Sequence, residues 1–457
     1  MRGEYWNPEL ETRPWAEVEV WQSGRIAEML PALHRNSPMY AELHKGVSVV
    51  AAFARFDDLC ALPFTTKEDL RKALEAGTDA EPFGTNQSAA TGDVIQCISS
   101  SGTTGSPVYY PLTRDDVDMF ADAIANTWFT AGVRRDDIVA HLVGLPMVAG
   151  GLPYADGFRR LGATLCWLGG FPTERILTEM RRLRATALLA TTSFGLYLAD
   201  RWEQAGRGCD IPSRLRKVLV GGEPGLGQPE IRERMSAGLG ITHLRDTMGL
   251  GDVISGMWSE CEAQEGMHFN AQRHVAIELI DAATLERIRW REGAEGELVY
   301  TAFAREAAPV VRYRSRDHVS VVATRCVCGR TSPRIRCIGR TDDMLIYKGM
   351  NVFPTSIRAC ILEVFAKDVE PMMRVWKEYA NQVRFDEPIA VDVEASPSLD
   401  LGHTDNLARE IEQHVRERLQ VRIAVRVVDP GDLEKSVYKN AMLAVRGADS
   451  KAGVSEQ

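Results

Sequence analysis

The sequence predicts an α/β fold with a large N-terminal domain of parallel βα sheets, a small β-barrel-like insert, and a small C-terminal α+β domain. Three observations predict this. Short β-forming runs alternate with helical patterns between about residues 135 and 250. Over 275–325 strand-like runs follow one another without helices, and after residue 340 helices and strands alternate again. We expect domains over 1–340 and 341–457, with the insert at about 270–335.

The first region predicts a parallel sheet. Its β-forming runs are Asp137–Leu145, Thr164–Leu168, Ala185–Thr192 and Lys217–Val220, and Thr173–Arg184 has the apolar spacing of a helix between two of them. Strands that alternate with helices form parallel sheets whose faces the helices cover.

The remaining regions predict smaller units. The runs VAIELID, GELVYTA and HVSVVA are separated by Gly, Glu and Arg, which indicates an antiparallel or barrel-like insert. The last region has helical patterns over Thr355–Phe365 and Asp405–Leu419, followed by the strand-like run VRIAVRVV. These elements are enough for a separate α+β domain.

Composition excludes several classes of protein. The chain has 457 residues, 45% of them hydrophobic and 26% charged, which excludes a fibre or a disordered tail. A formal charge of −9 argues against nucleic acid as a partner. No apolar run is long enough to span a membrane, and the N-terminal residues lack the apolar centre of a signal peptide. Nine scattered cysteines argue against a disulfide framework, so we expect a cytoplasmic protein.

A hydroxyl-rich segment is the first candidate site. Ser99–Pro107 reads SSSGTTGSP and directly follows the strand-like run Val94–Ile98. Such a segment offers backbone N–H groups and hydroxyls to a polyphosphate. It lacks the spacing of a Walker loop, and the β-like run VYYPL follows it, so we expect a hairpin loop. From composition alone, a surface turn without a ligand is an equal alternative.

A resemblance to a family decides between these readings. SSSGTTGSP resembles the phosphate-binding signature of the acyl-adenylate-forming enzymes. Further segments, in the same order along the chain, resemble the phenylacetate:CoA ligase branch: YWNPELE, GGEPG, DTMGLGD with GMWSECE, VVRYRSRD, IGRTDDMLIYKGMNVFP and DPGDLEKSVYKNA. The resemblance implies ATP-dependent activation of a carboxylic acid to acyl-AMP, then transfer to coenzyme A with release of AMP and pyrophosphate.

The resemblance also implies roles for individual residues. Lys439 would be the catalytic cation between the carboxylate and the α-phosphate, where charge builds up. Asp317 would accept hydrogen bonds from the ribose hydroxyls, and Asp252 would hold Mg²⁺. The full nucleotide-binding set is Ser101, Thr103, Thr104, Gly105, Gly222, Glu223, Pro224, Asp246, Met248, Asp317 and Arg340.

The C-terminal domain is expected to be mobile. Asp342 matches the hinge at which the family rotates this domain between an adenylating and a thioester-forming arrangement. Lys439 would enter the active site in the first arrangement. In the second, Lys348 and Gly349 would line the channel for the CoA thiol, because a glycine lets the backbone approach a ligand closely. Without the resemblance, Asp342 reads as part of a domain linker.

The resemblance places the acid-binding pocket near residues 143–157, with Leu145, Tyr154 and Gly249 as lining residues. Small and apolar residues predominate in this segment, which favours a flat aromatic or heteroaromatic acid. The alternative is that these side chains only pack a strand and the turn after it.

Three positions depart from the family pattern. Ser106 stands where the family usually has a lysine, Met248 where it has an aromatic residue, and Asp252 where it has a glutamate. These departures raise the alternative of a non-catalytic nucleotide-binding descendant. Retention of Lys439, Asp317, Arg340 and Asp342 argues against it.

Cysteine and histidine residues form a candidate zinc site. Cys261 and His268 lie in ECEAQEGMH, and Cys326 and Cys328 in CVCGR. Three thiolates and an imidazole are a ligand set of structural zinc, without an open position for a substrate. The alternative is three inert cysteines and a surface histidine.

The acceptor is open at this stage. Coenzyme A is the first expectation, and an amine or the thiol of a separate carrier protein is the alternative. A homodimer is compatible with the sequence, whereas nucleic acid and membrane partners are not expected.

Overall fold

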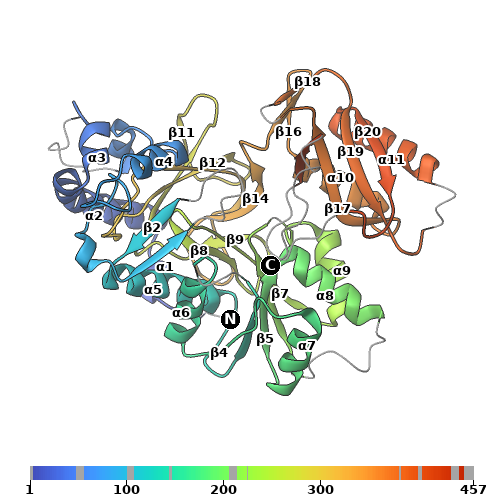
Figure 1. The fold of residues 1–457 in the computed structure, drawn as a ribbon, viewed down its shortest axis with the longest axis horizontal. Coiled ribbons are helices and arrows are strands. Elements are labelled where there is room, and N and C mark those ends of the chain that lie inside the picture. Colours follow the sequence, from blue (N-terminus) through green and yellow to red (C-terminus); the bar gives the residue numbers. More distant parts are fainter. Residues whose placement is uncertain are drawn as a thin grey trace.

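The computed structural model describes residues 4–47, 56–99, 108–143, 147–204, 214–223, 225–379, 382–399, 404–433 and 442–446. Two α/β units are visible: a large N-terminal body built on a twelve-stranded sheet, and a smaller C-terminal unit beside it (Figure 1). The predicted fold class is therefore confirmed. No helix in the described ranges has the length and apolar character needed to cross a bilayer.

The N-terminal segment packs a group of helices on one flank of the large sheet (Figure 1). Helix α2 (Trp15–Asn36) buries Val18, Ile26, Leu30 and Leu33, a spacing that puts them on one face of a helix. Thr66 and its N3 partner Asp69 form a capping box at the start of α4. The elements are α1 (Pro8–Glu11), α2, α3 (Pro38–Leu43), η1 (Phe56–Ala61), α4 (Lys67–Glu75) and η2 (Thr91–Asp93).

A two-stranded hairpin carries the hydroxyl-rich segment. Strands β1 (Gln96–Ser99) and β2 (Tyr109–Leu112) pair antiparallel, with Ser99 opposite Tyr109. The two strands that flank the segment therefore pair as a hairpin, and β2, not a helix, follows it, as predicted. Residues 100–107 themselves lie outside the described part of the chain. Helix α5 (Arg114–Thr130) follows, and a capping box of Thr113 and Asp116 begins it.

The parallel part of the large sheet confirms the predicted alternation. In spatial order its strands are β7, β6, β5, β3 and β4, all parallel to their neighbours. Gly162 and Gly240 adopt positive φ values and end α6 and α9. The elements are β3 (Ile138–His141), α6 (Leu152–Leu161), β4 (Thr164–Trp167), α7 (Thr173–Arg182), β5 (Ala187–Thr191), α8 (Thr192–Gln204), β6 (Lys217–Gly221), α9 (Pro229–Leu239) and β7 (His243–Leu250).

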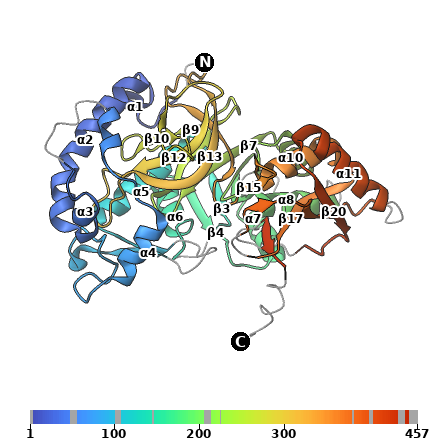
Figure 2. The same ribbon diagram turned by 90° about the horizontal axis from the view of Figure 1, so that it is seen from above.

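The predicted insert is antiparallel and belongs to the same sheet. Strand β8 pairs antiparallel with β7, and the order continues through β9, β14, β13, β12, β10 and β11. Seen from above, these strands curve strongly (Figure 2). Their bounds are β8 (Ile254–Glu260), β9 (Met267–Phe269), β10 (Ala276–Ile280), β11 (Arg287–Ile288), β12 (Glu295–Thr301), β13 (Tyr313–Ala323) and β14 (Arg334–Arg340).

In its described residues, the C-terminal unit has a three-stranded sheet, a four-stranded sheet and two helices. It lies beside α8 and α9 (Figure 1), and Arg234 on α9 forms an ion pair of 2.6 Å with Glu370 of β17. The elements are β15 (Leu345–Tyr347), β16 (Met350–Val352), α10 (Pro354–Phe365), β17 (Val369–Lys377), β18 (Arg384–Phe385), β19 (Ile389–Ala395), α11 (Thr404–Leu419), β20 (Ile423–Val428) and β21 (Leu443–Val445).

Candidate active site

The Gly-Glu turn lies at the carboxyl edge of the parallel strands. Thr191, Gly221 and Thr247 are paired side by side on β5, β6 and β7. A Cβ atom on Gly221 would lie 2.5 Å from the carbonyl oxygen of Thr247, so the close approach of β6 to β7 requires glycine there. Gly222 has φ +83° and turns the chain outward at this edge. This is the edge at which open α/β sheets bind ligands.

Glu223 is held by the start of helix α8. Its Oε1 accepts a hydrogen bond from the backbone N–H of Ser193 at 2.9 Å, in the first turn of α8. Its carbonyl oxygen accepts another from the Thr192 hydroxyl at 3.1 Å. Burial lowers the pKa of Arg358 on α10 to about 10, and the charge of Glu223 opposes this shift. The negative charge of Glu223 therefore favours the charged form of Arg358, a residue of the C-terminal unit.

Asp246 and Met248 lie on β7, the strand next to this turn. The backbone N–H of Asp246 donates to Glu260 at 2.9 Å, and Arg232 makes a bidentate pair with Glu260 at 2.8 and 2.7 Å. Burial and the nearby Glu260 charge raise the pKa of Asp246 to about 8. The side chain therefore carries a proton at neutral pH and can donate a hydrogen bond.

Asp317, Arg340 and Asp342 form one charged group where the two units join. Asp317 and Arg340 are paired on β13 and β14, and Arg340 Nη1 lies 3.5 Å from Asp317 Oδ1. Arg340 also donates two hydrogen bonds to Asp342, at 2.9 and 2.8 Å. The two carboxylates together raise the pKa of Arg340 against the effect of burial. Asp317, predicted to bind the ribose, and Asp342, the predicted hinge residue, therefore both contact the guanidinium of Arg340.

Asp252 is buried and already balanced by a cation. Lys67 Nζ, from the first residue of α4, lies 2.5 Å from its Oδ1, and the Tyr110 hydroxyl donates to the same oxygen. The backbone carbonyl of Asp252 accepts from Arg305 at 3.0 Å. One carboxylate that is paired with a lysine is a sparse donor set for Mg²⁺, which prefers several oxygen ligands. Mg²⁺ at Asp252 therefore stays a prediction.

The predicted acid pocket brings Tyr154 and Gly249 together. The Tyr154 hydroxyl donates to the carbonyl oxygen of Ser255 at 2.7 Å. A Cβ on Gly249 would lie 1.9 Å from the same oxygen, so this turn accepts no side chain. A Cβ on Gly251 would lie 2.9 Å from Ala149, which places the turn after β7 against the segment before α6.

The predicted CoA residues lie on the C-terminal unit. Lys348 and Gly349 form the exposed turn between β15 and β16, with φ values of +48° and +89°. A Cβ on Gly349 would have no atom within 4 Å. A side chain there would extend into open space.

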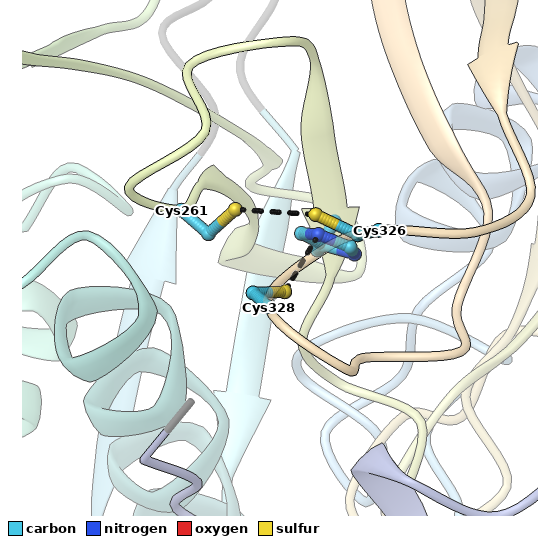
Figure 3. A group of neighbouring side chains, drawn as sticks. Cys261, Cys326 and Cys328 are labelled. Atoms are coloured by element: carbon cyan, nitrogen blue, oxygen red, sulfur yellow. Dashed lines mark hydrogen bonds between the residues drawn. The ribbon is translucent and has the colours of Figure 1, made fainter. Parts of the chain in front are cut away.

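Cys261, Cys326 and Cys328 converge (Figure 3), and His268 joins them, as the sequence predicts. Their ligand atoms all lie within 4.8 Å of one another. The Sγ atoms of Cys261 and Cys326 are 3.7 Å apart, and Cys328 Sγ is 3.5 Å from His268 Nε2. Tetrahedral zinc with its usual bond lengths would separate two sulfurs by about 3.8 Å, and a sulfur and a nitrogen by about 3.6 Å. The residues therefore fit the metal.

A second polar contact orients the histidine of this group. His268 Nδ1 lies 3.3 Å from the Ser332 hydroxyl, which leaves Nε2 facing the cysteines. Hydrogen bonds from Cys261 and Cys326 hold the pKa of Cys328 far below the usual thiol range, whereas the pKa values of Cys261 and Cys326 are raised, so one thiolate is shared within the metal-free group; burial lowers the pKa of His268. A thiolate and a neutral imidazole are the forms that bind zinc.

Several predicted residues lie outside the described part of the chain. They are Ser101, Thr103, Thr104, Gly105, Leu145, Pro224 and Lys439. Their assigned roles stay predictions.

Lys67 and Tyr110 are contacts of the candidate site that the sequence analysis missed. The PFTTKEDL segment shows only a capped helix start, and nothing in it indicates a partner 185 residues away. Tyr110 belongs to the β-like run VYYPL, and its position just after the hydroxyl-rich segment is the one signal in the sequence that could have indicated it.

Comparison with known proteins matches most of the chain. The family model of the AMP-binding enzymes matches residues 39–302, and that of the AMP-binding enzyme C-terminal domain matches 349–444. A phenylacetate-coenzyme A ligase of Thermus thermophilus is 30% identical over 447 residues, 94% of this chain and 97% of that protein. A phenylacetate-coenzyme A ligase of Pseudomonas putida is 32% identical and covers 94% of each chain.

Solved structures match the same fold. A crystal structure of 2-hydroxyisobutyryl-CoA ligase in the postadenylation state with 2-HIB-AMP gives a TM-score of 0.85, at 24% identity, over 96% of this chain and 92% of that one. The same ligase in the thioesterification state, with 2-HIB-AMP and CoA, gives 0.68 over the same shares. The chain belongs to the AMP-binding enzyme family, in the branch of the phenylacetate-CoA ligases.

Proposed function

We propose that the protein converts an aromatic or heteroaromatic carboxylic acid to its CoA thioester, with ATP as the activating substrate. The two half-reactions follow from its family. A carboxylate oxygen attacks the α-phosphorus of ATP, and pyrophosphate leaves. The CoA thiol then loses its proton and attacks the acyl carbonyl, and AMP leaves with both electrons of the broken C–O bond.

The observation that carries the proposal is the grouping of Asp317, Arg340 and Asp342. A carboxylate suited to the ribose, a guanidinium suited to phosphate, and the hinge residue lie in contact where the two family domains meet. In this assignment Arg340 positions the nucleotide. Because Arg340 also contacts Asp342, nucleotide binding would change the interactions of the hinge residue. Lys439 would supply the cation that stabilises the charge on the α-phosphoryl group.

The C-terminal unit alternates between two positions in this proposal. The Arg234–Glu370 pair would hold one position, and the exposed Lys348–Gly349 turn would reach CoA in the other. Support comes from the TM-scores against 2-hydroxyisobutyryl-CoA ligase, 0.85 in its postadenylation state and 0.68 in its thioesterification state. The difference indicates that the fold of that ligase is arranged differently in the two states.

The Cys261, His268, Cys326 and Cys328 group is proposed to bind a structural zinc ion. Cys261 follows β8, His268 lies on β9, and Cys326 and Cys328 follow β13, so the metal would cross-link three antiparallel strands of the large sheet. When bound, zinc supplies cross-linking only, because all four of its positions are taken by protein atoms.

A cytoplasmic location is proposed from the cysteines. None of the eight cysteines in the described ranges forms a disulfide, as expected in a reducing compartment. An amine or a carrier-protein thiol is the alternative acceptor, and a homodimer is compatible with this assignment.

The test is pyrophosphate release with panels of aryl, arylacetic, short aliphatic and sugar acids. We expect release with aromatic acids, and CoA consumption in step with it. Preference for a sugar acid would contradict the assigned pocket, and acid-dependent release without CoA consumption would favour the alternative acceptor.

A further inference from the structure

Buried polar groups without hydrogen-bond partners gather around Tyr154. Both ring nitrogens of His141, the indole Nε1 of Trp128 and the hydroxyl of Ser255 are fully enclosed and have no partner among the described residues. Native proteins leave few such groups, and each costs about 1–3 kcal/mol when nothing pairs with it. Three unpaired side chains at one place therefore indicate a missing polar ligand.

Contacts place these groups around the predicted acid pocket. The ring of Tyr154 lies 5.0 Å from that of Trp128 and 6.1 Å from that of His141, and its hydroxyl bonds to Ser255. Tyr154 is therefore the common neighbour of all three unpaired groups. The ring of Trp167, 5.2 Å from His141, covers another side.

The strand register puts His141 near the nucleotide edge. His141 ends β3 and pairs with Leu189 of β5, which pairs with Leu219 of β6. Leu219 is two residues before Gly221, where the nucleotide turn begins. A group held by His141 would thus lie deeper in the sheet than the nucleotide, as the far end of an acyl-AMP would.

His141 is a neutral side chain at working pH. It is 0% exposed, and burial lowers its pKa to about 4. The carbonyl of Gly151 faces the ring and partly offsets the effect of burial, although it also accepts a hydrogen bond from the Ala155 N–H. A neutral imidazole has one N–H donor and one nitrogen acceptor, so with its N–H toward Gly151 the acceptor nitrogen still has no partner among the described residues.

We propose that His141 is a specificity residue that recognises a hydroxyl group on the ring of the acid. The proposal rests on the function assigned above and narrows its substrate class to hydroxylated aromatic acids. A phenolic hydroxyl can donate to one imidazole and accept from another donor, and the Trp128 and Ser255 groups add further donors. Neither the unsubstituted acid nor its methyl ether offers both roles.

The experiment compares matched acids. Values of kcat/KM are measured by pyrophosphate release for the best unsubstituted aromatic acid, its three ring-hydroxy isomers and the corresponding methyl ethers. With the wild-type protein, at least one hydroxy isomer should exceed its parent by about 10-fold or more, because an unpaired buried group costs about 1–3 kcal/mol. Its methyl ether should not.

Variants separate recognition from packing. His141→Leu should reduce the preference to less than about 2-fold while the parent acid still reacts, and His141→Gln, which keeps a donor and an acceptor, should restore part of it. If His141→Leu does not fold, the ratio in His141→Gln and in Trp128→Phe is the readout, and it should fall in both.

The outcomes distinguish failure of the role proposed for His141 from failure of the assigned enzymatic function. Equal kcat/KM for all members of the matched set, or an unchanged preference in the variants that fold, would overturn the role of His141 alone. No pyrophosphate release with any acid would overturn the assigned function.

Discussion

Lys67 Nζ lies 2.5 Å from Oδ1 of Asp252, although the two residues are 185 positions apart in the sequence. The lysine begins α4, and the aspartate follows β7 at the edge of the predicted acid and nucleotide sites. The pair places a positive charge beside Tyr110, directly after the loop in which Ser106 replaces the usual family lysine.

Loss of this charge should affect both stability and catalysis. Lys67→Met leaves Asp252, whose side chain is 5% exposed, without its cation, and should lower the free energy of unfolding by about 1–3 kcal/mol. Acid-dependent pyrophosphate release should fall at least 10-fold. Urea unfolding and the release assay measure the two effects. Lys72→Met, at an exposed lysine of the same helix, is the control and should change neither.

The raised pKa of Asp246 predicts a pH dependence. This side chain keeps its proton in the folded protein up to about pH 8, whereas in the unfolded chain it loses it near the ordinary value of 3.8. Its contribution to stability is therefore largest at low pH and is lost as pH rises through about 4 to 8. Above pH 8 the new negative charge should also raise the KM for ATP.

Asp246→Asn mimics the protonated form. Its KM for ATP should stay flat between pH 7 and 9.5, and it should melt above the wild-type temperature at pH 9. Thermal melts and ATP titrations at saturating acid test this, and a KM that rises equally in both proteins would exclude Asp246 as the titrating group.

Zinc content should depend on the predicted ligands. Protein purified without a histidine tag should contain about one zinc per chain, and Cys328→Ser should lose it and melt at a lower temperature. Cys166→Ser, a free cysteine away from the group, should keep both zinc and stability. Elemental analysis that finds no metal in the wild-type protein would remove the zinc assignment.

The two half-reactions should separate by mutation. Lys439→Ala should nearly abolish acyl-AMP formation while supplied acyl-AMP still reacts with CoA. Gly349→Leu should do the reverse, because the side chain has space but occupies the proposed thiol path. Gly349→Ala shares the strain of a φ of +89° and is the matched control. Single-turnover assays of each step measure the effects, and equal loss in both steps would remove either residue from its role.

The sequence predicted the fold because local patterns carry it. The alternation that places β3, β5 and β6 in a parallel sheet is visible in each segment, and the hairpin of β1 and β2 follows from two β-like runs around a turn-forming loop. The zinc group could also be predicted from the sequence, because its four residues are of the types that bind this metal.

Contacts between distant segments could not be predicted in the same way. The Lys67–Asp252 pair and the unpaired nitrogens of His141 arise only when α4, β3 and β7 are packed together. In the sequence, Lys67 is one helix residue and His141 one strand residue, and neither differs from residues that serve only packing. The contact of Arg340 with both Asp317 and Asp342 likewise depends on the pairing of β13 with β14.

The central claim is that the protein makes acyl-CoA from an aromatic acid through an acyl-AMP. Mass spectrometry of the products from a pooled acid library, with ATP, magnesium and CoA, tests it most directly. The account predicts an aromatic acyl-CoA with AMP and pyrophosphate in equal amounts, and an acyl-AMP when CoA is omitted. Formation of ADP and phosphate, or an unreacted pool, would contradict it.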